Sequence, residues 1–134
     1  MASSVLVIAA CQPMQMLLTK CLGANQHEVL VADDMPEAVR VLDGALPDIN
    51  LVNVSDAAPV SVLEDMRAHK LTGTSRKQAP VILLDRGATP QRRVGALSSG
   101  ARDLLSWPLN RRLLLARERG VHREGHAARE IERR

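Results

Sequence analysis

The feature of the sequence that most constrains the fold is an alternation between short apolar runs and segments with helical spacing. Five runs have the character of buried strands, at about residues 5–10, 27–32, 49–54, 80–85 and 102–108. In the segments that follow them, apolar residues recur at i, i+3 and i+4. This alternation is typical of strand and helix units arranged around a parallel sheet.

Proline and capping residues predict where the helices begin. The predicted starts are Pro13, Pro36, a capping box of Ser61 with Glu64, Thr89 with Pro90, and Asn110. Apolar residues on these helices are expected to face the sheet: Met14, Leu17, Leu18, Cys21 and Leu22; Ala38, Val39 and Leu42; Val62, Leu63 and Met66; Val94 and Leu97. Five strands alternating with five helices predict a three-layer αβα sandwich of the flavodoxin-like kind, with strand order 2-1-3-4-5.

In that fold, four of the strands end around one crevice, where open α/β sheets bind ligands. The residues expected there are Ala9, Ala10, Cys11, Asn53, Asp85, Ser106 and Trp107. A metal or a nucleophile is not indicated, because alanine carries no ligand and asparagine has neither charge nor nucleophilic character.

Composition excludes some functions. Trp107 is the only aromatic residue, so no platform exists on which nucleic acid bases can stack. Residues 111–134 hold eight arginines against four glutamates, which assigns the basic pI to the tail and leaves residues 1–110 nearly neutral. We therefore expect one domain at 1–119 and an Arg/Glu-rich helix or linker at 120–134 that leads to an output domain. Nucleic acid and membranes are not expected partners of the domain.

Several segments together resemble the receiver domains of bacterial two-component response regulators. They are "VLVIAA", "HEVLVADDMPEAVRVL", "LPDINLVNV", "APVILLD" and "SGARDLLSWPLNRRLL", and the likeness covers about residues 4–119. The last segment is the most specific, since it is similar to the Gly-Ala-x-Asp-x-Leu-x-Lys-Pro stretch around the fifth strand of that family.

The resemblance implies a phosphoryl transfer that this chain lacks the residues to perform. In the family, an aspartate after strand three accepts the phosphoryl group, an acidic pair after strand one holds magnesium, and a hydroxyl residue and a lysine bind the phosphoryl oxygens. By position, these fall here on Asn53, on Ala9 with Ala10, on Asp85 and on Trp107. The aromatic switch position of strand five falls on Leu104.

These replacements oppose phosphorylation on physical grounds. An amide at Asn53 forms no acyl phosphate, and the methyl groups of Ala9 and Ala10 offer no oxygen to magnesium. A carboxylate at Asp85 repels a phosphoryl group, by about 4 kcal/mol for unit charges at ~4 Å and intermediate dielectric. We therefore expect no catalytic residue, no cofactor and no metal.

Other acidic residues have simpler explanations. Asp56 lies three residues past Asn53, where a turn-forming aspartate is usual, and it is a weak candidate for a displaced phosphoacceptor. Asp48 begins the third strand at the opposite end of the sheet. Asp33 with Asp34 follows the second strand, outside the crevice, and is expected to be a solvated pair.

Cysteine and histidine residues carry weak signals for a site. Cys11 is expected to be an unreactive filler rather than a sensing thiol, and Cys21 to lie in the core. His122 and His126 have i, i+4 spacing that suits a metal only if a third ligand exists, so a solvated tail is preferred. Leu114, Val121, Ala128 and Ile131 hint at a short interhelical seam in the tail.

A partner surface is expected around the fourth helix, fifth strand and fifth helix. Trp107 either fills the vacated pocket or stands exposed as an interface anchor, and the sequence leaves both open. The other residues assigned to this surface are Arg92, Arg93, Arg102, Leu104 and Arg112.

The sequence thus predicts a phosphorylation-independent pseudo-receiver, in the cytoplasm, that acts by contacts with a signalling protein, an output domain or a second copy. A sensor that binds a polar small molecule near Cys11, Asn53 and Asp85 is the alternative. An enzyme of flavodoxin-like fold is a weaker one, since the chain has no Gly-rich phosphate loop.

Overall fold

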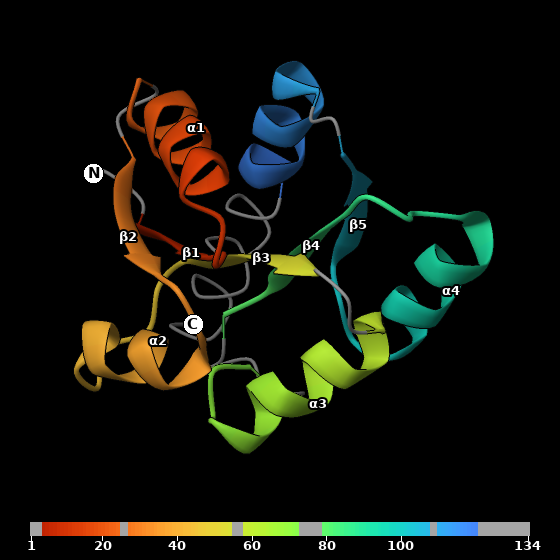
Figure 1. The fold of residues 1–134 in the computed structure, drawn as a ribbon, viewed down its shortest axis with the longest axis horizontal. Helices are drawn as coiled ribbons and strands as arrows, with labels where there is room; N and C mark the ends of the chain where they lie inside the picture. The colour runs from red at the N-terminus through yellow and green to blue at the C-terminus, as the bar shows by residue number, and fades with distance from the viewer. Residues whose placement is uncertain (1–3, 25–26, 55–57, 73–78, 108–109, 121–134) are drawn as a thin grey trace, which may run out of the picture.

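The computed structural model describes residues 4–24, 27–54, 58–72, 79–107 and 110–120. Strands and helices alternate along these residues (Figure 1). In chain order they are β1 (Ser4–Ile8), α1 (Gln12–Gly23), β2 (Glu28–Ala32), α2 (Met35–Leu42), β3 (Ile49–Val54), α3 (Pro59–Ala68), β4 (Val81–Asp85), α4 (Pro90–Ser98) and β5 (Asp103–Ser106). Residues 111–120 are also helical.

The sheet has five parallel strands in the order β2-β1-β3-β4-β5, which confirms the predicted fold. Figure 1 shows α1 and the helix at 111–120 on one face of the sheet, with α2, α3 and α4 on the other. Since β3 lies in the middle, the ends of β1, β3 and β4 are neighbours. The register pairs Ile8 with Val52 and Asn53 with Leu84.

Two hydrophobic clusters, one on each face of the sheet, form the core. Alternate residues of each strand face opposite sides, because the side-chain period of a strand is two. On the α2, α3 and α4 side, Leu6, Val52 and Leu83 meet Leu63 and Met66. The cluster on the side of α1 includes Val7, Leu51, Leu84, Leu18 and Leu114.

Most of the predicted helix starts are confirmed. Thr89 caps α4, since its Oγ1 accepts the N–H of Arg92 at 3.1 Å, and Asn110 Oδ1 accepts the N–H of Leu113 at 3.1 Å. The Ser61–Glu64 capping box is wrong. α3 begins earlier, at Pro59, after Ala58, which supplies no side-chain cap. Proline suits the first turn of a helix because it has no N–H to leave unpaired there, and this places Ser61 inside the helix.

Four residues that were expected to face the sheet are exposed instead: Leu17, Val39, Val94 and Leu97. The difference is largest in α4, where Val94 is 61 % and Leu97 42 % exposed while Ala96 is fully buried. A small side chain facing the sheet lets the helix pack closely, and the larger residues then turn outward. α4 therefore presents an apolar surface to solvent.

Candidate functional site

The crevice at the carboxyl ends of β1 and β3 lies open toward α2 and α3. Ala9 is buried beside it, Ala10 is exposed and Asn53 is half-buried. All three line a cavity of about 700 Å³. The remaining lining residues include Met35, Val62 and four acidic ones, which are Asp33, Asp34, Glu64 and Asp65. The other four residues assigned to the crevice do not line this cavity; they are Cys11, Asp85, Ser106 and Trp107.

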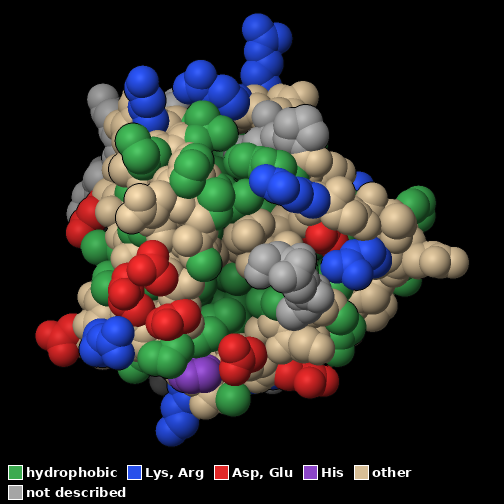
Figure 2. All heavy atoms as spheres, in the orientation of Figure 1, with side chains coloured by type: hydrophobic (Ala, Val, Ile, Leu, Met, Phe, Trp, Pro, Cys, Tyr) green, Lys and Arg blue, Asp and Glu red, His purple; other side chains and the backbone are tan. Residues whose placement is uncertain are grey.

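The acidic pair after β2 has a structural task. Asp33 Oδ1 accepts the Nε2–H of Gln15 at 2.6 Å, and the same amide donates to the carbonyl of Ala9. Asp34 caps α2 by accepting the N–H of Glu37 at 2.8 Å. Figure 2 shows acidic side chains gathered on this face beside a hollow lined by hydrophobic ones. The pair is exposed, as expected, and it also holds α1 and α2 against the end of β1. Its expected position outside the crevice is wrong, because both aspartates line the same cavity as Ala9 and Asn53.

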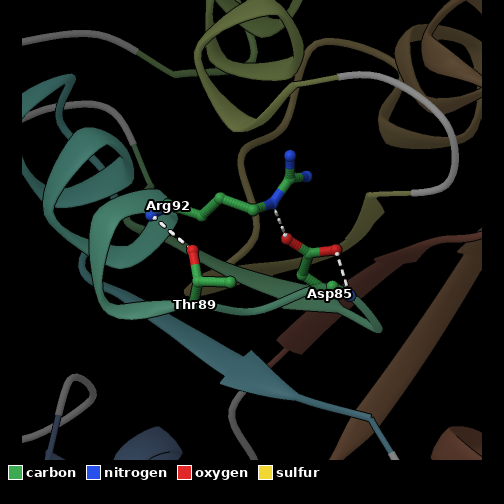
Figure 3. A network of polar contacts seen from close by, with 4 residues as sticks. Asp85, Thr89 and Arg92 are labelled. Atoms are coloured by element: carbon green, nitrogen blue, oxygen red, sulfur yellow. Dashed lines mark hydrogen bonds and ion pairs between the residues drawn. The ribbon is translucent and has the colours of Figure 1, made fainter.

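Asp85, the last residue of β4, is only 2 % exposed, and its side chain forms hydrogen bonds and an ion pair (Figure 3). Its Oδ2 accepts the Nε–H of Arg92 at 2.7 Å, and its Oδ1 accepts the N–H of Gly87 at 3.0 Å. The carbonyl of Asp85 accepts the N–H of Trp107 at 3.1 Å. The position at which the family has a phosphoryl-binding hydroxyl therefore holds a carboxylate that is engaged by an internal guanidinium.

Trp107 is half-buried and packs against the cluster on the α1 side of the sheet, as does Cys11. It does not line the cavity beside Ala9 and Asn53. Its ring thus neither fills that hollow nor stands fully exposed. Cys21 is buried in the core of α1, as expected.

The residues assigned to the partner surface are arranged unequally. Arg92 turns inward to Asp85, while Arg93, Arg102 and Arg112 are exposed. The placement of Leu104 on this surface is wrong, because its side chain is 3 % exposed and belongs to the core. Alternation along β5 turns Leu104 toward the α4 side of the sheet, under that helix.

Sequence reasoning missed the role of Asp103, the first residue of β5. Its carboxylate is almost completely buried and contacts Arg93 Nη2 and Arg117 Nε, each at 3.1 Å. One carboxylate thus joins α4 to the helix at 111–120. The available signal was an acidic residue at the start of a buried strand, because a buried charge is normally paired.

A second overlooked pair joins the far end of that helix to the loop before β2. Glu118 is fully buried, and its Oε2 lies 3.1 Å from Nε2 of His27. At the amino end of the sheet, Asp48 Oδ2 accepts the N–H of Ser4 at 2.7 Å, which confirms that Asp48 lies far from the crevice. Three residues discussed above, Asp56, His122 and His126, lie outside the described residues, as does the tail from 121 onward.

The crevice does not fit magnesium. The two positions after β1 carry methyl groups, and Asn53 offers one neutral oxygen. Of the carboxylates in the cavity wall, Asp33 and Asp34 already accept hydrogen bonds from Gln15 and from the N–H of Glu37. Within the described residues, no three His, Cys, Asp or Glu side chains converge on a possible metal position. No described helix is long and apolar enough to cross a membrane.

Comparison with known proteins agrees with this fold. The receiver domain protein, CheY-like, from Methanospirillum hungatei JF-1 superposes with a TM-score of 0.77 over 96 % of this chain and 99 % of that one, at 20 % identity. NtrX from Brucella abortus gives 0.77 over 98 % of this chain and 29 % of its own, at 22 % identity. No protein-family model matches the sequence.

A sequence relative supports the same assignment. The transcriptional regulatory protein CpxR of Klebsiella pneumoniae subsp. pneumoniae (strain HS11286) is 33 % identical over 112 residues, which is 82 % of this chain. The chain spans 45 % of that relative's length. By its fold and by this match, the chain is a receiver domain of the response-regulator type.

Proposed function

We propose that this domain is a pseudo-receiver, which transmits a signal by protein contacts without being phosphorylated. The observation that carries the proposal is the environment of Asp85. This buried carboxylate is paired with Arg92, and it lies at the position where receiver domains have a neutral hydroxyl that binds the phosphoryl group. The methyl groups at Ala9 and Ala10 and the amide at Asn53 support it, because they remove the metal ligands and the acceptor together. The domain acts as a binding module and not as an enzyme.

Beryllofluoride with magnesium tests this proposal, since this complex mimics a phosphoryl group on an aspartate. We expect the amide NMR spectrum of the wild-type protein to stay unchanged on addition of both reagents. The Asn53→Asp variant is expected to stay unchanged too, because one carboxylate does not restore the metal ligands. Saturable shifts of the amides around residue 53 in the wild type would contradict the proposal.

The contacts are proposed to use α4, β5 and the helix at 111–120, either between two copies or with a signalling partner. Val94 and Leu97 give this surface exposed apolar side chains, and Arg93, Arg102 and Arg112 add exposed arginines on the same elements and next to β5. Exposed apolar groups within a polar rim are typical of interfaces. The tail after residue 120 is proposed to lead to an output domain, because the CpxR relative is more than twice as long as the matched region. The cytoplasm is the proposed location of the protein.

Aspartate at position 94 tests this surface. We expect Val94→Asp to weaken self-association or partner binding at least tenfold in analytical ultracentrifugation, because it replaces an exposed apolar side chain of this surface with a charge. Val39→Asp is the matched control on α2, since Val39 is also a solvent-exposed helical valine. Equal weakening by both substitutions would count against the proposed surface.

A sensor of a polar small molecule is the second candidate, and the cavity of about 700 Å³ is the observation that favours it. Its acidic wall suits a cationic ligand rather than an anionic one. The site differs from the one expected from sequence, because Asn53 lines it while Cys11 and Asp85 do not. A thermal-shift screen in which a cationic metabolite raises the melting temperature well above controls would support this function.

A further inference from the structure

α4 is weakly anchored by apolar contacts. It buries a single side chain, Ala96, whereas α1, α2 and α3 bury three or four residues each. Its larger apolar residues, Val94 and Leu97, face solvent. An alanine contributes little buried area, so hydrophobic burial alone holds this helix less firmly than its neighbours.

Polar contacts replace the missing apolar ones at the beginning of α4. Arg92 and Arg93 are consecutive in the first turn, and each pairs with an almost completely buried carboxylate, Asp85 or Asp103. Positive charge near a helix N-terminus is unfavourable with respect to the helix dipole, and no acidic residue of α4 compensates it. The two aspartates therefore supply the compensation from outside the helix.

The two carboxylates also connect α4 to the rest of the domain. The carboxylate of Asp85 holds the connecting loop by accepting the N–H of Gly87. Asp103 binds Arg117 of the helix at 111–120 with its second oxygen. Two sets of ionic contacts therefore meet at the consecutive residues Arg92 and Arg93. One runs to the end of β4, as Figure 3 shows, and the other runs to β5 and the helix at 111–120.

We propose that Asp85 and Asp103 clamp α4 through Arg92 and Arg93, and so hold the partner surface in one arrangement with no phosphoryl group required. The carboxylate of Asp85 acts as a permanent internal anion at the end of β4, and Arg92 transmits its position to the helix. The inference rests on the proposed function only in taking α4 as part of the partner surface. The clamp itself consists only of contacts within the domain.

Amide hydrogen exchange of the full chain tests the clamp. The variants are Asp85→Asn, Arg92→Gln and the double substitution, and Arg86→Gln is the control, because Arg86 is an exposed arginine of the same loop. We expect amides of α4 to exchange about tenfold faster in each single variant, with β1 and β3 unchanged and with Arg86→Gln like the wild type. In the double variant the effect should not exceed that of the stronger single one, as for two members of one contact.

Three results would overturn the clamp. They are a change below threefold in α4 for both single variants, additive effects in the double variant, or an equal acceleration in β1, β3 and α4, which reports global destabilisation. Arg92→Gln alters a side chain that is already 35 % exposed, so it tests the contact even where Asp85→Asn fails to fold. Failure of the clamp leaves the beryllofluoride result unaffected, and the two proposals are therefore separable.

Discussion

Replacement of Leu83 by alanine is expected to lower the free energy of unfolding by about 3 kcal/mol. Leu83 is fully buried in β4 and belongs to the cluster that joins the sheet to α2, α3 and α4. Its truncation removes apolar contacts and leaves a cavity that close-packed neighbours fill only in part. Because this cluster also contains Ala96 of α4, the loss of these contacts also weakens the packing of α4, which is part of the proposed partner surface.

Urea unfolding followed by circular dichroism measures this effect. Leu97→Ala is the matched control, because it removes the same atoms from a side chain that is 42 % exposed, and we expect it to change stability by less than about 1 kcal/mol. Similar losses for the two variants would show that the assignment of Leu83 to the interior and Leu97 to the surface is incorrect.

Conversion of Asn50 to aspartate is expected to lower stability at pH 7 by about 3 kcal/mol. Asn50 is fully buried in β3, and its Nδ2 donates to the carbonyls of Leu71 and Ala79 at 3.5 and 3.4 Å. Its Oδ1 has no hydrogen-bond partner among the described residues. A carboxylate there loses both donated hydrogen bonds and repels two carbonyl oxygens.

The loss depends on pH in a defined direction. Burial raises the pKa of the introduced carboxyl in the folded state above the value of about 3.9 that it has in the unfolded chain. Between these two values the folded state holds the proton and the unfolded state does not, so stability falls as pH rises. Relative to the wild type, the variant is therefore least impaired near pH 4 and most impaired at neutral pH.

Urea unfolding at pH 7 and pH 4.5 checks this prediction, and Asn53→Asp is its control. Asn53 lies three residues later in the same strand but is half-buried at the open crevice, where water stabilises a charge. We expect its conversion to cost about 1 kcal/mol and to vary little over this pH interval. A cost for Asn50→Asp equal to that for Asn53→Asp would contradict the assigned burial of Asn50.

The fold was predictable because each strand and helix carries its own signal. The apolar run that ends at Asp85 is long enough for a central strand. The caps Thr89 and Asn110 each accept an N–H three residues further along the chain, so the sequence alone was sufficient to locate them. Strand order followed from the rules for parallel sheets, and the structure has the same order. The start of α3 was misplaced because Pro59 and Ser61 both suit a helix start and the sequence does not rank them.

The candidate site was predictable in its positions and not in its contacts. Local pattern located the ends of β1 and β3, so Ala9 and Asn53 were expected at one crevice and both line its cavity. The pairs Asp85–Arg92 and Asp103–Arg117 depend on how α4 and the last helix lie on the sheet. Spacing along the chain does not encode which arginine reaches a buried carboxylate. Leu104 was misassigned because alternation along β5 turns its side chain under α4.

Intact mass spectrometry after incubation with acetyl phosphate and magnesium is the most direct test of the central claim, which is that this crevice accepts no phosphoryl group. We expect an unchanged mass for the wild-type chain and for Asn53→Asp, while a standard receiver domain treated in parallel gains one phosphoryl group. A stoichiometric, acid-stable but base-labile phosphoryl adduct on the wild-type chain would contradict it.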